Sequence, residues 1–260
     1  MDEHTLASRA VALSRSDSRM LKHLMGDVVS RRGEFLIEKA MRAIAAILAV
    51  GRLKTQATGM ENIPAQGPAL IVVRHYHHLY DGLALFAAMP RQFHIVVAID
   101  WVKNRRVQWF MQTVNRIACW PTLLRADAVA RCNYSTRLFS PADVARYRRS
   151  ALGDAAELLV QNKVVVIFPE GYPNIDPNYT PKKNFDEFLP FKPGFLQILR
   201  AAEKKTNRAI PIIPAGLCYR AGACWEAFLK FGEPIGRDHC SDPVQLLRYV
   251  EERVRELSAE

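Results

Sequence analysis

The 260-residue sequence lacks several features that would place a chain in a large class at once. Its five cysteines form no Cys-x-x-Cys pair, and no internal repeat or low-complexity segment is present. An odd cysteine number without such pairs is typical of reduced thiols, and it argues against a disulfide framework or a cysteine metal site. We also find no signal-peptide pattern at the start of the sequence. We therefore expect a folded protein with reduced thiols.

Long hydrophobic runs are also missing. The longest apolar stretch, 43–51, is about half of the roughly 20 residues that a transmembrane helix needs. Arg42 and Arg52 bracket it, and further basic residues lie nearby, a composition typical of a helix lying at the level of lipid headgroups. A core helix packed on the main domain fits the pattern equally well.

Acidic residues are in the minority. There are 26 Asp and Glu against 36 Lys and Arg, which gives a net charge of +10 and a pI near 9.6. This excess favours a polyanionic partner, such as nucleic acid, an anionic membrane surface or a phosphorylated substrate, without choosing among them. Basic and aromatic residues alternate over 101–110, but an amphipathic helix explains that spacing better, so we expect no nucleic acid partner.

Short apolar runs alternate with helical patterns along the chain. The runs predict strands at 54–58, 69–73, 93–99, 117–124, 163–168, 210–215 and 228–231. Helices are predicted near 18–30, 34–51, 100–114 and 193–204, with two more beginning after the caps Ser140-Pro141 and Asp242-Pro243. We predict an α/β fold, a single sheet flanked by helices on both faces, with an N-terminal helical, membrane-proximal extension over 1–53 and the α/β domain over 54–260.

Three histidines and an aspartate follow the apolar strand 69–73. A histidine acts as a general base when a carboxylate holds its other ring nitrogen in one tautomer. Asp81 can do this for His77 if 77–81 is helical, since the two then lie one turn apart. It can do so for His75 if the segment folds back as a loop, and His78 is also within reach. No second ligand cluster accompanies them, so we expect no metal.

Three further groups of residues end a strand or begin a helix. Glu170 and Gly171 follow the strand 163–168, and Arg125 ends the strand 117–124. Lys192 and Gly194 lie at the start of the helix 193–204, where free backbone N–H groups and a lysine can form an anion site. The polar segment 172–190 is longer than most connections, and such loops are often functional.

In this order, the motifs resemble the phospholipid/glycerol acyltransferase family, which includes the 1-acylglycerol-3-phosphate acyltransferases. The resemblance covers roughly residues 54–216. It rests on a Gly-x-Glu-Asn-Ile-Pro lead-in, a strand ending in His and Asp, Phe-Pro-Glu-Gly, Phe-Lys-x-Gly and an apolar strand with prolines. These are Gly59 to Pro64, the 71–81 stretch, Phe168 to Gly171, Phe191 to Gly194 and Pro211 to Pro214.

The resemblance implies transfer of a fatty acyl group from an acyl thioester, on coenzyme A or acyl carrier protein, to a lipid hydroxyl. It makes His75 the base, with His77 as the rival, and Asp81 the residue that orients the imidazole. Arg125, Glu170, Gly171, Lys192 and Gly194 would bind substrate. The thioester carriers are co-substrates, and no other cofactor is expected. With an anionic membrane surface as partner, we expect a peripheral or monotopic enzyme on the cytoplasmic side.

The sequence departs from the family pattern twice. The family separates His and Asp by four residues, whereas five stand between His75 and Asp81 and three between His77 and Asp81. The family usually continues Phe-Pro-Glu-Gly with Thr-Arg-Ser, and here 172–174 read Tyr-Pro-Asn. The shifted histidine also motivates an alternative function, a catalytically inactive lipid-binding member of the family.

Overall fold

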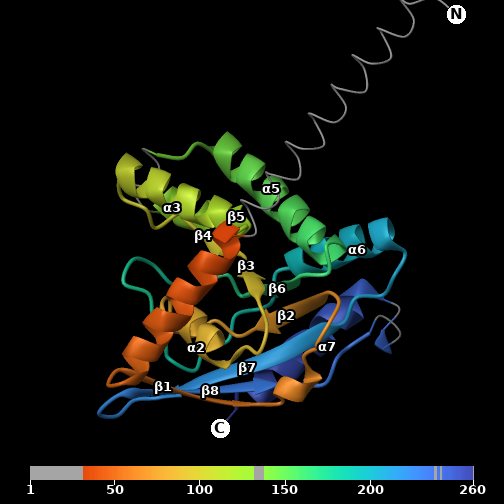
Figure 1. Ribbon diagram of the computed structural model, residues 1–260. Helices are drawn as coiled ribbons and strands as arrows, with labels where there is room; N and C mark the ends of the chain where they lie inside the picture. Colours follow the sequence, from red (N-terminus) through yellow and green to blue (C-terminus); the bar gives the residue numbers. More distant parts are fainter. Residues whose placement is uncertain (1–31, 132–137, 237–238, 241, 260) are drawn as a thin grey trace, which may run out of the picture.

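A mixed six-stranded sheet runs through the centre of the molecule (Figure 1). The computed structural model describes residues 32–131, 138–236, 239–240 and 242–259. Only β7 and β8 pair antiparallel, and the other four pairings are parallel. In spatial order the strands are β1 (Leu53–Thr58), β8 (Trp225–Phe231), β7 (Ile212–Arg220), β2 (Ala69–Val73), β6 (Val164–Ile167) and β3 (Phe93–Ile95).

Strand β2 lies inside the sheet because every one of its residues is apolar. Its sequence, Ala-Leu-Ile-Val-Val, is buried at all five positions, as expected of a parallel strand covered on both faces. It pairs with β7 on one side and with β6 on the other, where Val72 lies opposite Ile167. The carboxyl ends of β2 and β6 are therefore neighbours at one edge of the sheet.

Helices cover both faces of the sheet and form two hydrophobic cores. On one face, α2 (Tyr80–Ala88) packs on β1 and β8, and a helix over residues 32–49, called here the N-terminal helix, joins the same core. On the other face lie α5 (Pro141–Val160), α6 (Gly194–Thr206) and α7 (Pro243–Leu257). Alternate residues of β2 enter the two cores, Ile71 on the first and Val72 on the second. The predicted α/β sheet with helices on both faces is confirmed.

The region between β3 and α5 differs from the prediction. The expected strand 93–99 divides, because Val96 ends the pairing with β6 and β4 (Val97–Ala98) turns to pair with β5 (Thr122–Leu123). The expected strand 117–124 shrinks to β5, since α3 (Arg105–Ile117) extends further than predicted. A second, two-stranded sheet results. The sequence analysis missed α4 (Ala126–Arg131) and a 3₁₀ turn, η1 (Met60–Asn62).

Both predicted helix caps form. The Ser140 hydroxyl accepts a hydrogen bond from the Asp143 N–H, and the Asp143 carboxylate accepts the Ser140 N–H in return, a capping box. The Asp242 carboxylate accepts the Gln245 N–H at 3.1 Å at the start of α7. These local signals fix where the two helices begin.

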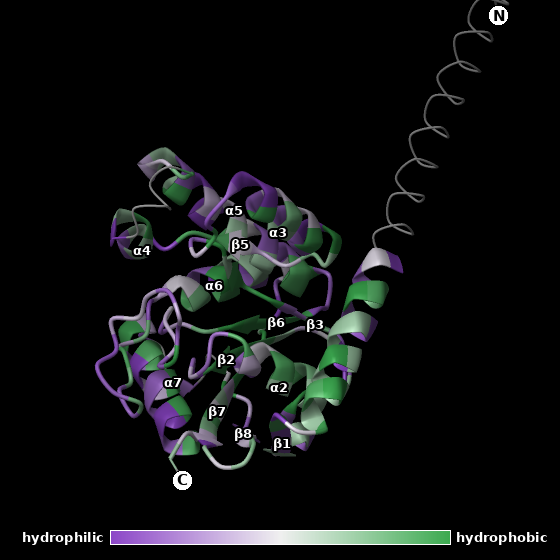
Figure 2. Ribbon diagram, turned by 90° about the vertical axis from the view of Figure 1, so that its left-hand side faces the viewer, coloured by the Kyte–Doolittle hydropathy of each residue, from purple (hydrophilic) through white to green (hydrophobic). Residues whose placement is uncertain are grey.

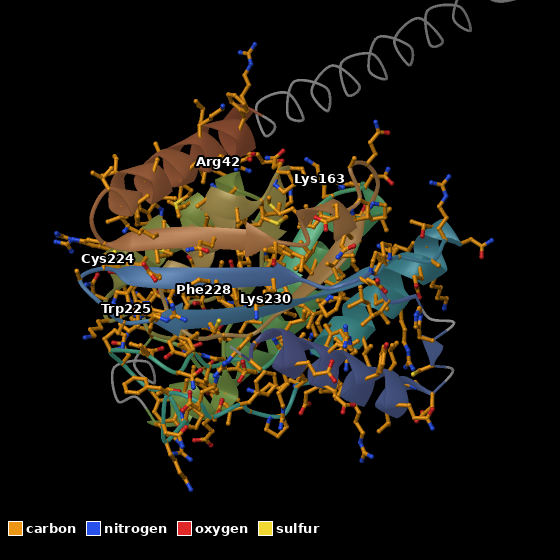
Figure 3. The ribbon with its side chains drawn as sticks, turned by 90° about the horizontal axis from the view of Figure 1, so that it is seen from below. Arg42, Lys163, Cys224, Trp225, Phe228 and Lys230 are labelled. Carbon is orange, nitrogen blue, oxygen red and sulfur yellow. The ribbon has the colours of Figure 1, made fainter. Side chains whose placement is uncertain are left out.

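Arg42 ties the N-terminal helix to α2, in addition to apolar contacts. The Arg42 guanidinium donates to the carbonyl oxygens of Phe86 and Met89, both at 3.0 Å, at the end of α2. Ala45 is buried in the core beneath the helix. Figure 3 shows Arg42 above β1, with Trp225, Phe228 and Lys230 on the neighbouring β8.

The predicted helix 34–51 corresponds to the N-terminal helix, whereas the predicted helix 18–30 lies outside the described residues. Among the helices that the structure describes, none combines the length and the apolar composition needed to cross a bilayer.

Candidate active site

His75 and Asp81 are in direct contact at the carboxyl end of β2. The His75 Nδ1 lies 2.7 Å from the Asp81 Oδ2, and the imidazole stacks on Phe168 with ring centroids 4.4 Å apart. The His75 side chain is 17% exposed, whereas Asp81 is almost fully buried. Because the carboxylate accepts a hydrogen bond from Nδ1–H, Nε2 is the ring nitrogen that stays unprotonated in the neutral imidazole.

Three other donors fix the Asp81 carboxylate. Oδ2 also accepts the Tyr76 N–H at 2.7 Å, and Oδ1 accepts the His77 N–H at 2.9 Å. The Tyr219 hydroxyl on β7 donates to Oδ1 at 2.8 Å, and burial together with Asp81 raises the pKa of Tyr219 well above its ordinary value. Asp81 therefore has a fixed position, as the orienting partner of a base requires.

The loop between the two residues accommodates their unusual spacing. Helix α2 begins only at Tyr80, with Leu79 as its N-cap, so residues 77–79 are not helical. The chain from His75 to Tyr80 instead curls around the Asp81 carboxylate and turns two backbone N–H groups toward it. Five intervening residues thus bring His75 to Asp81, in the manner of the fold-back that the sequence analysis left open.

His77 occupies a different environment. Its Nδ1 accepts hydrogen bonds from the N–H groups of Leu79 and Tyr80, both at 3.2 Å, where α2 begins. Burial, and then the neighbouring His78, lower the pKa of His77 to about 4. Its ring also stacks on Tyr80. His77 thus caps a helix and contacts Asp81 through its backbone, and the exposed His78 lies over the Ile175 carbonyl.

Glu170 lies beside the pair but directs both carboxylate oxygens into the protein. Oε1 accepts the His75 N–H and Oε2 accepts the Leu189 N–H, each at 2.9 Å. Oε2 also forms an ion pair at 2.6 Å with Lys182, and both side chains are fully buried. The structure therefore uses Glu170, a predicted substrate-binding residue, to hold the backbone of His75.

Lys182 is a site residue that the sequence analysis missed. Its ammonium group donates to Glu170, to the carbonyl oxygen of His75 and to Oδ1 of Asn174, the last two at 2.9 Å. Burial lowers the pKa of Lys182, an effect that Glu170 opposes. Together, Glu170 and Lys182 bind the N–H and the C=O of His75, so the loop 172–190 is tied to this histidine.

Arg125 supports the turn that follows β6. Its guanidinium pairs with Asp100 through Nε and Nη2, the latter at 2.6 Å, and Nη1 donates to the Gly171 carbonyl at 2.8 Å. Although burial opposes the charge, the Asp100 hydrogen bonds raise the pKa of Arg125. Gly171 has a φ of +77°, a conformation that glycine adopts most easily. Asp100 was not foreseen, because 25 residues separate it from Arg125.

Lys192 and Gly194 lie at the mouth of this turn. The Lys192 side chain is exposed and passes so close to Gly171 that a Cβ there would lie 3.2 Å from Nζ. The Tyr172 ring lies 4.2 Å from the Arg125 guanidinium carbon and 5.0 Å from the Lys192 ammonium. Helix α6 starts at Gly194 with no side-chain cap, so no capping side chain accepts its first N–H groups.

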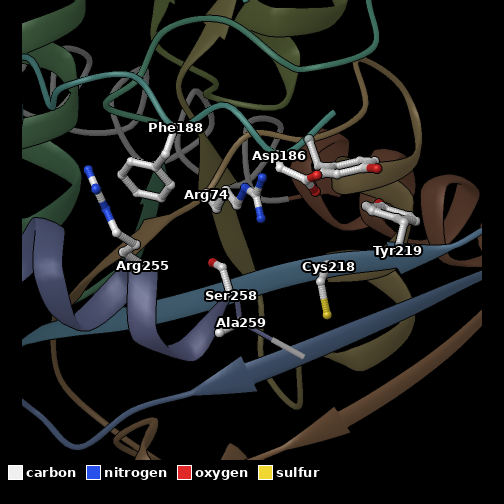
Figure 4. Close-up of a pocket in the computed structure, with 9 residues that line it drawn as sticks. Arg74, Asp186, Phe188, Cys218, Tyr219, Arg255, Ser258 and Ala259 are labelled. Atoms are coloured by element: carbon white, nitrogen blue, oxygen red, sulfur yellow. The ribbon is translucent and has the colours of Figure 1, made fainter. Parts of the chain in front are cut away.

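A cavity of about 420 Å³ lies next to residues that donate hydrogen bonds to the Asp81 carboxylate (Figure 4). Tyr76 and Tyr219 line it, and both donate to Asp81, whereas His75 does not line it. The guanidinium of Arg74 projects into it between the rings of Tyr76 and Phe188. No cluster of three His, Cys, Asp or Glu side chains suited to a metal occurs in the described part of the chain.

Comparison with known proteins fits this geometry. The sequence model of the family described as Acyltransferase matches residues 54–217, which is more than half of the chain. The chain belongs to the phospholipid/glycerol acyltransferase family. A search of curated proteins finds no match. Among solved structures, the fold resembles that of PlsC from Thermotoga maritima, a 1-acyl-sn-glycerophosphate (LPA) acyltransferase. The TM-score is 0.53 and the identity 19%, over 91% of this chain and 90% of that one.

The residues of the predicted site gather at the carboxyl edge of the sheet formed by β2 and β6, around the turn that follows β6 and at the helix start beside it. His75 and Asp81 meet there, with Glu170 next to them. Arg125, Lys192 and Gly194 gather around the Gly171 turn. This acyltransferase therefore combines a polarised histidine with a nearby exposed cation.

Proposed function

We propose that this acyltransferase moves a fatty acyl group from an acyl thioester to a hydroxyl of a glycerolipid or related lipid. The observation that carries the proposal is the 2.7 Å contact between His75 Nδ1 and Asp81, which leaves Nε2 as the basic nitrogen. Four donors fix the carboxylate, and two buried charges fix the histidine backbone. The donor is a fatty acyl thioester of coenzyme A or of acyl carrier protein, used as a co-substrate.

The proposed reaction begins at the free ring nitrogen of His75. Nε2 of His75 removes the proton from the acceptor hydroxyl while Asp81 stabilises the imidazolium that forms. The acceptor oxygen attacks the thioester carbonyl carbon and gives a tetrahedral intermediate. Its collapse breaks the C–S bond, and the imidazolium returns the proton to the departing thiolate. The ester and the free thiol leave, and no acyl-enzyme is required.

The acceptor headgroup is proposed to lie at the Gly171 turn. Lys192 and the first N–H groups of α6, beginning at Gly194, offer an exposed cation and free donors for a phosphate. Arg125 and Glu170 support this site without facing the acceptor, since Arg125 holds the Gly171 turn and Glu170 holds His75. A phosphorylated acceptor such as a 1-acylglycerophosphate fits this arrangement, and the structurally similar PlsC is named for acyl transfer to that class of substrate.

The lipid acceptor places the enzyme at a membrane, and the N-terminal helix is suited to that location. Its outer side exposes large apolar residues, among them Leu36, Ile47 and Val50 at its end. Arg32, Lys39 and Arg52 lie along the same segment. We infer peripheral or monotopic attachment on the cytoplasmic side through this helix, with anionic lipids attracted by the net charge of +10.

The direct test is an acceptor panel. The release of free thiol is followed with two donors, acyl-coenzyme A and acylated acyl carrier protein. The acceptors are lysophospholipids, glycerol phosphate and simple alcohols. The variants are His75→Ala, His77→Ala and Asp81→Ala. We expect turnover with a lipid acceptor that requires His75 and Asp81 and largely survives the loss of His77. Full activity of Asp81→Ala would rule out the proposed mechanism.

The alternative function, a lipid-binding protein without transferase activity, rests on the departure from the family's His–Asp spacing. It predicts lipid binding with no thiol release for any acceptor in the same panel. The polarised His75 favours the enzyme, because a binding protein has no need of a buried carboxylate that fixes one tautomer.

A further inference from the structure

Helix α3 has an outer face that is both apolar and basic. Trp109, Phe110 and Ile117 are 68%, 57% and 41% exposed. Arg105, Arg106 and Arg116 are exposed at the same helical spacing, and the helix contains no acidic residue. The inner face already fills its share of the core, because Val107 and Met111 pack on a cluster that includes Ile99 and Leu124. The outer residues Trp109, Phe110 and Ile117 are not part of this cluster.

This face adjoins the N-terminal helix. Gly33 lies against Ile117 so closely that a Cβ on the glycine would be 2.6 Å from the Ile117 side chain. Of 13 large apolar side chains exposed in the described residues, eight lie on these two helices or directly after them. Figure 2 shows the largely hydrophobic N-terminal helix at the right and α3 near it at the upper edge. Most of the large apolar side chains that are exposed in the described residues thus lie on two neighbouring helices.

We propose that α3 is a second membrane-binding element, which lies in the interface of an anionic bilayer beside the N-terminal helix. Aromatic residues with one polar edge prefer this interface, and arginines in the same layer bind lipid phosphates. The absence of acidic residues from α3 makes the surface complementary to anionic headgroups. The inference extends the membrane attachment proposed above, but it does not depend on acyl transfer.

Vesicle binding by the full chain tests the apolar part. We compare Trp109→Ser/Phe110→Ser with the control Val244→Ser on α7, where the side chain is similarly exposed at 57%. We expect the double variant to bind phosphatidylserine-containing vesicles at least about tenfold more weakly and the control to match wild type. Trp109→Phe should retain binding but lose most of the tryptophan quenching caused by brominated lipids.

The basic part is tested with Arg105→Gln/Arg106→Gln against Arg248→Gln on α7. Each arginine at the surface is expected to contribute about fivefold on anionic vesicles. The α3 double variant should therefore lose roughly 25-fold on anionic vesicles and almost nothing on phosphatidylcholine vesicles, while Arg248→Gln stays close to wild type.

Two outcomes would overturn the proposal. Wild-type affinity of both α3 double variants, alongside lost binding in Ile47→Ser/Val50→Ser, would leave membrane attachment to the N-terminal helix alone. Arginine-dependent binding of duplex DNA, with no vesicle binding by wild type, would identify α3 as a nucleic-acid surface and would also remove the membrane attachment proposed above. Because neither readout measures turnover, loss of the acyltransferase mechanism would leave both results interpretable.

Discussion

His75 and His77 are two residues apart and have opposite surroundings. His75 faces a buried carboxylate through Nδ1, whereas His77 accepts two backbone N–H groups through the same atom. The first arrangement requires a proton on Nδ1 and leaves Nε2 basic. The second requires Nδ1 to be unprotonated, and burial lowers the pKa of that ring to about 4. Hydrogen-bond partners, more than distance along the chain from Asp81, therefore distinguish the proposed base from the helix cap.

The largest effect on kcat should come from replacing each of the two histidines separately. His75→Gln removes the proposed base, and we expect kcat to fall by about 10²–10⁴-fold. His77→Gln keeps a side-chain acceptor near the start of α2, so the rate should stay within about tenfold of wild type. Steady-state kinetics on both variants, with circular dichroism to confirm folding, measure the contrast. Equal losses would contradict the assignment of the two roles.

The next largest effect concerns the support of His75. Lys182→Met leaves the buried Glu170 charge unpaired, which should destabilise the fold by about 3–5 kcal/mol and lower kcat. Lys183→Met is the matched control, since that side chain is exposed. Urea unfolding and kcat are measured for both. Adding Glu170→Gln should restore part of the lost stability, and a double variant no more stable than Lys182→Met would show that the pair is not coupled.

A smaller effect is expected from Tyr219→Phe. The change removes one donor to the Asp81 carboxylate and leaves the ring in place. A hydrogen bond to a charged group contributes about 1.5–3 kcal/mol, so kcat should fall by roughly 10- to 150-fold with little change in KM. Tyr249→Phe on α7 is the control. An unchanged kcat in Tyr219→Phe would mean that three donors suffice to hold Asp81.

The smallest effect is a pH dependence of stability. The unfolded chain protonates His77 below about pH 6.5, whereas the folded protein resists this until about pH 4. Neutral His77 thus contributes fully to the free energy of unfolding above about pH 6.5. This contribution is lost as the pH falls toward about 4, by about 1–3 kcal/mol in total. His77→Asn keeps a capping acceptor and lacks this titration. Urea unfolding at pH 7 and pH 5 should show a smaller loss for the variant, and equal losses would contradict the expected titration.

Much of the fold was predictable because its signals are local. The apolar run of β2, the caps at Ser140 and Asp242, and the turn at Gly171 each depend on a few adjacent residues. The division of 93–99 into β3 and β4 was not predictable, because it depends on β5, which lies more than twenty residues later.

The same distinction holds for the site. The sequence by itself determined that a histidine and an aspartate follow a buried strand, with Glu170 after a second strand and Lys192 before a helix. Only the tertiary structure decided that His75 is the histidine paired with Asp81, because the loop folds back around the carboxylate. It also supplied Tyr219 and Lys182, which come from distant segments. Residue order fixes which groups reach the sheet edge, but the hydrogen bonds formed in the tertiary structure fix the orientation of each.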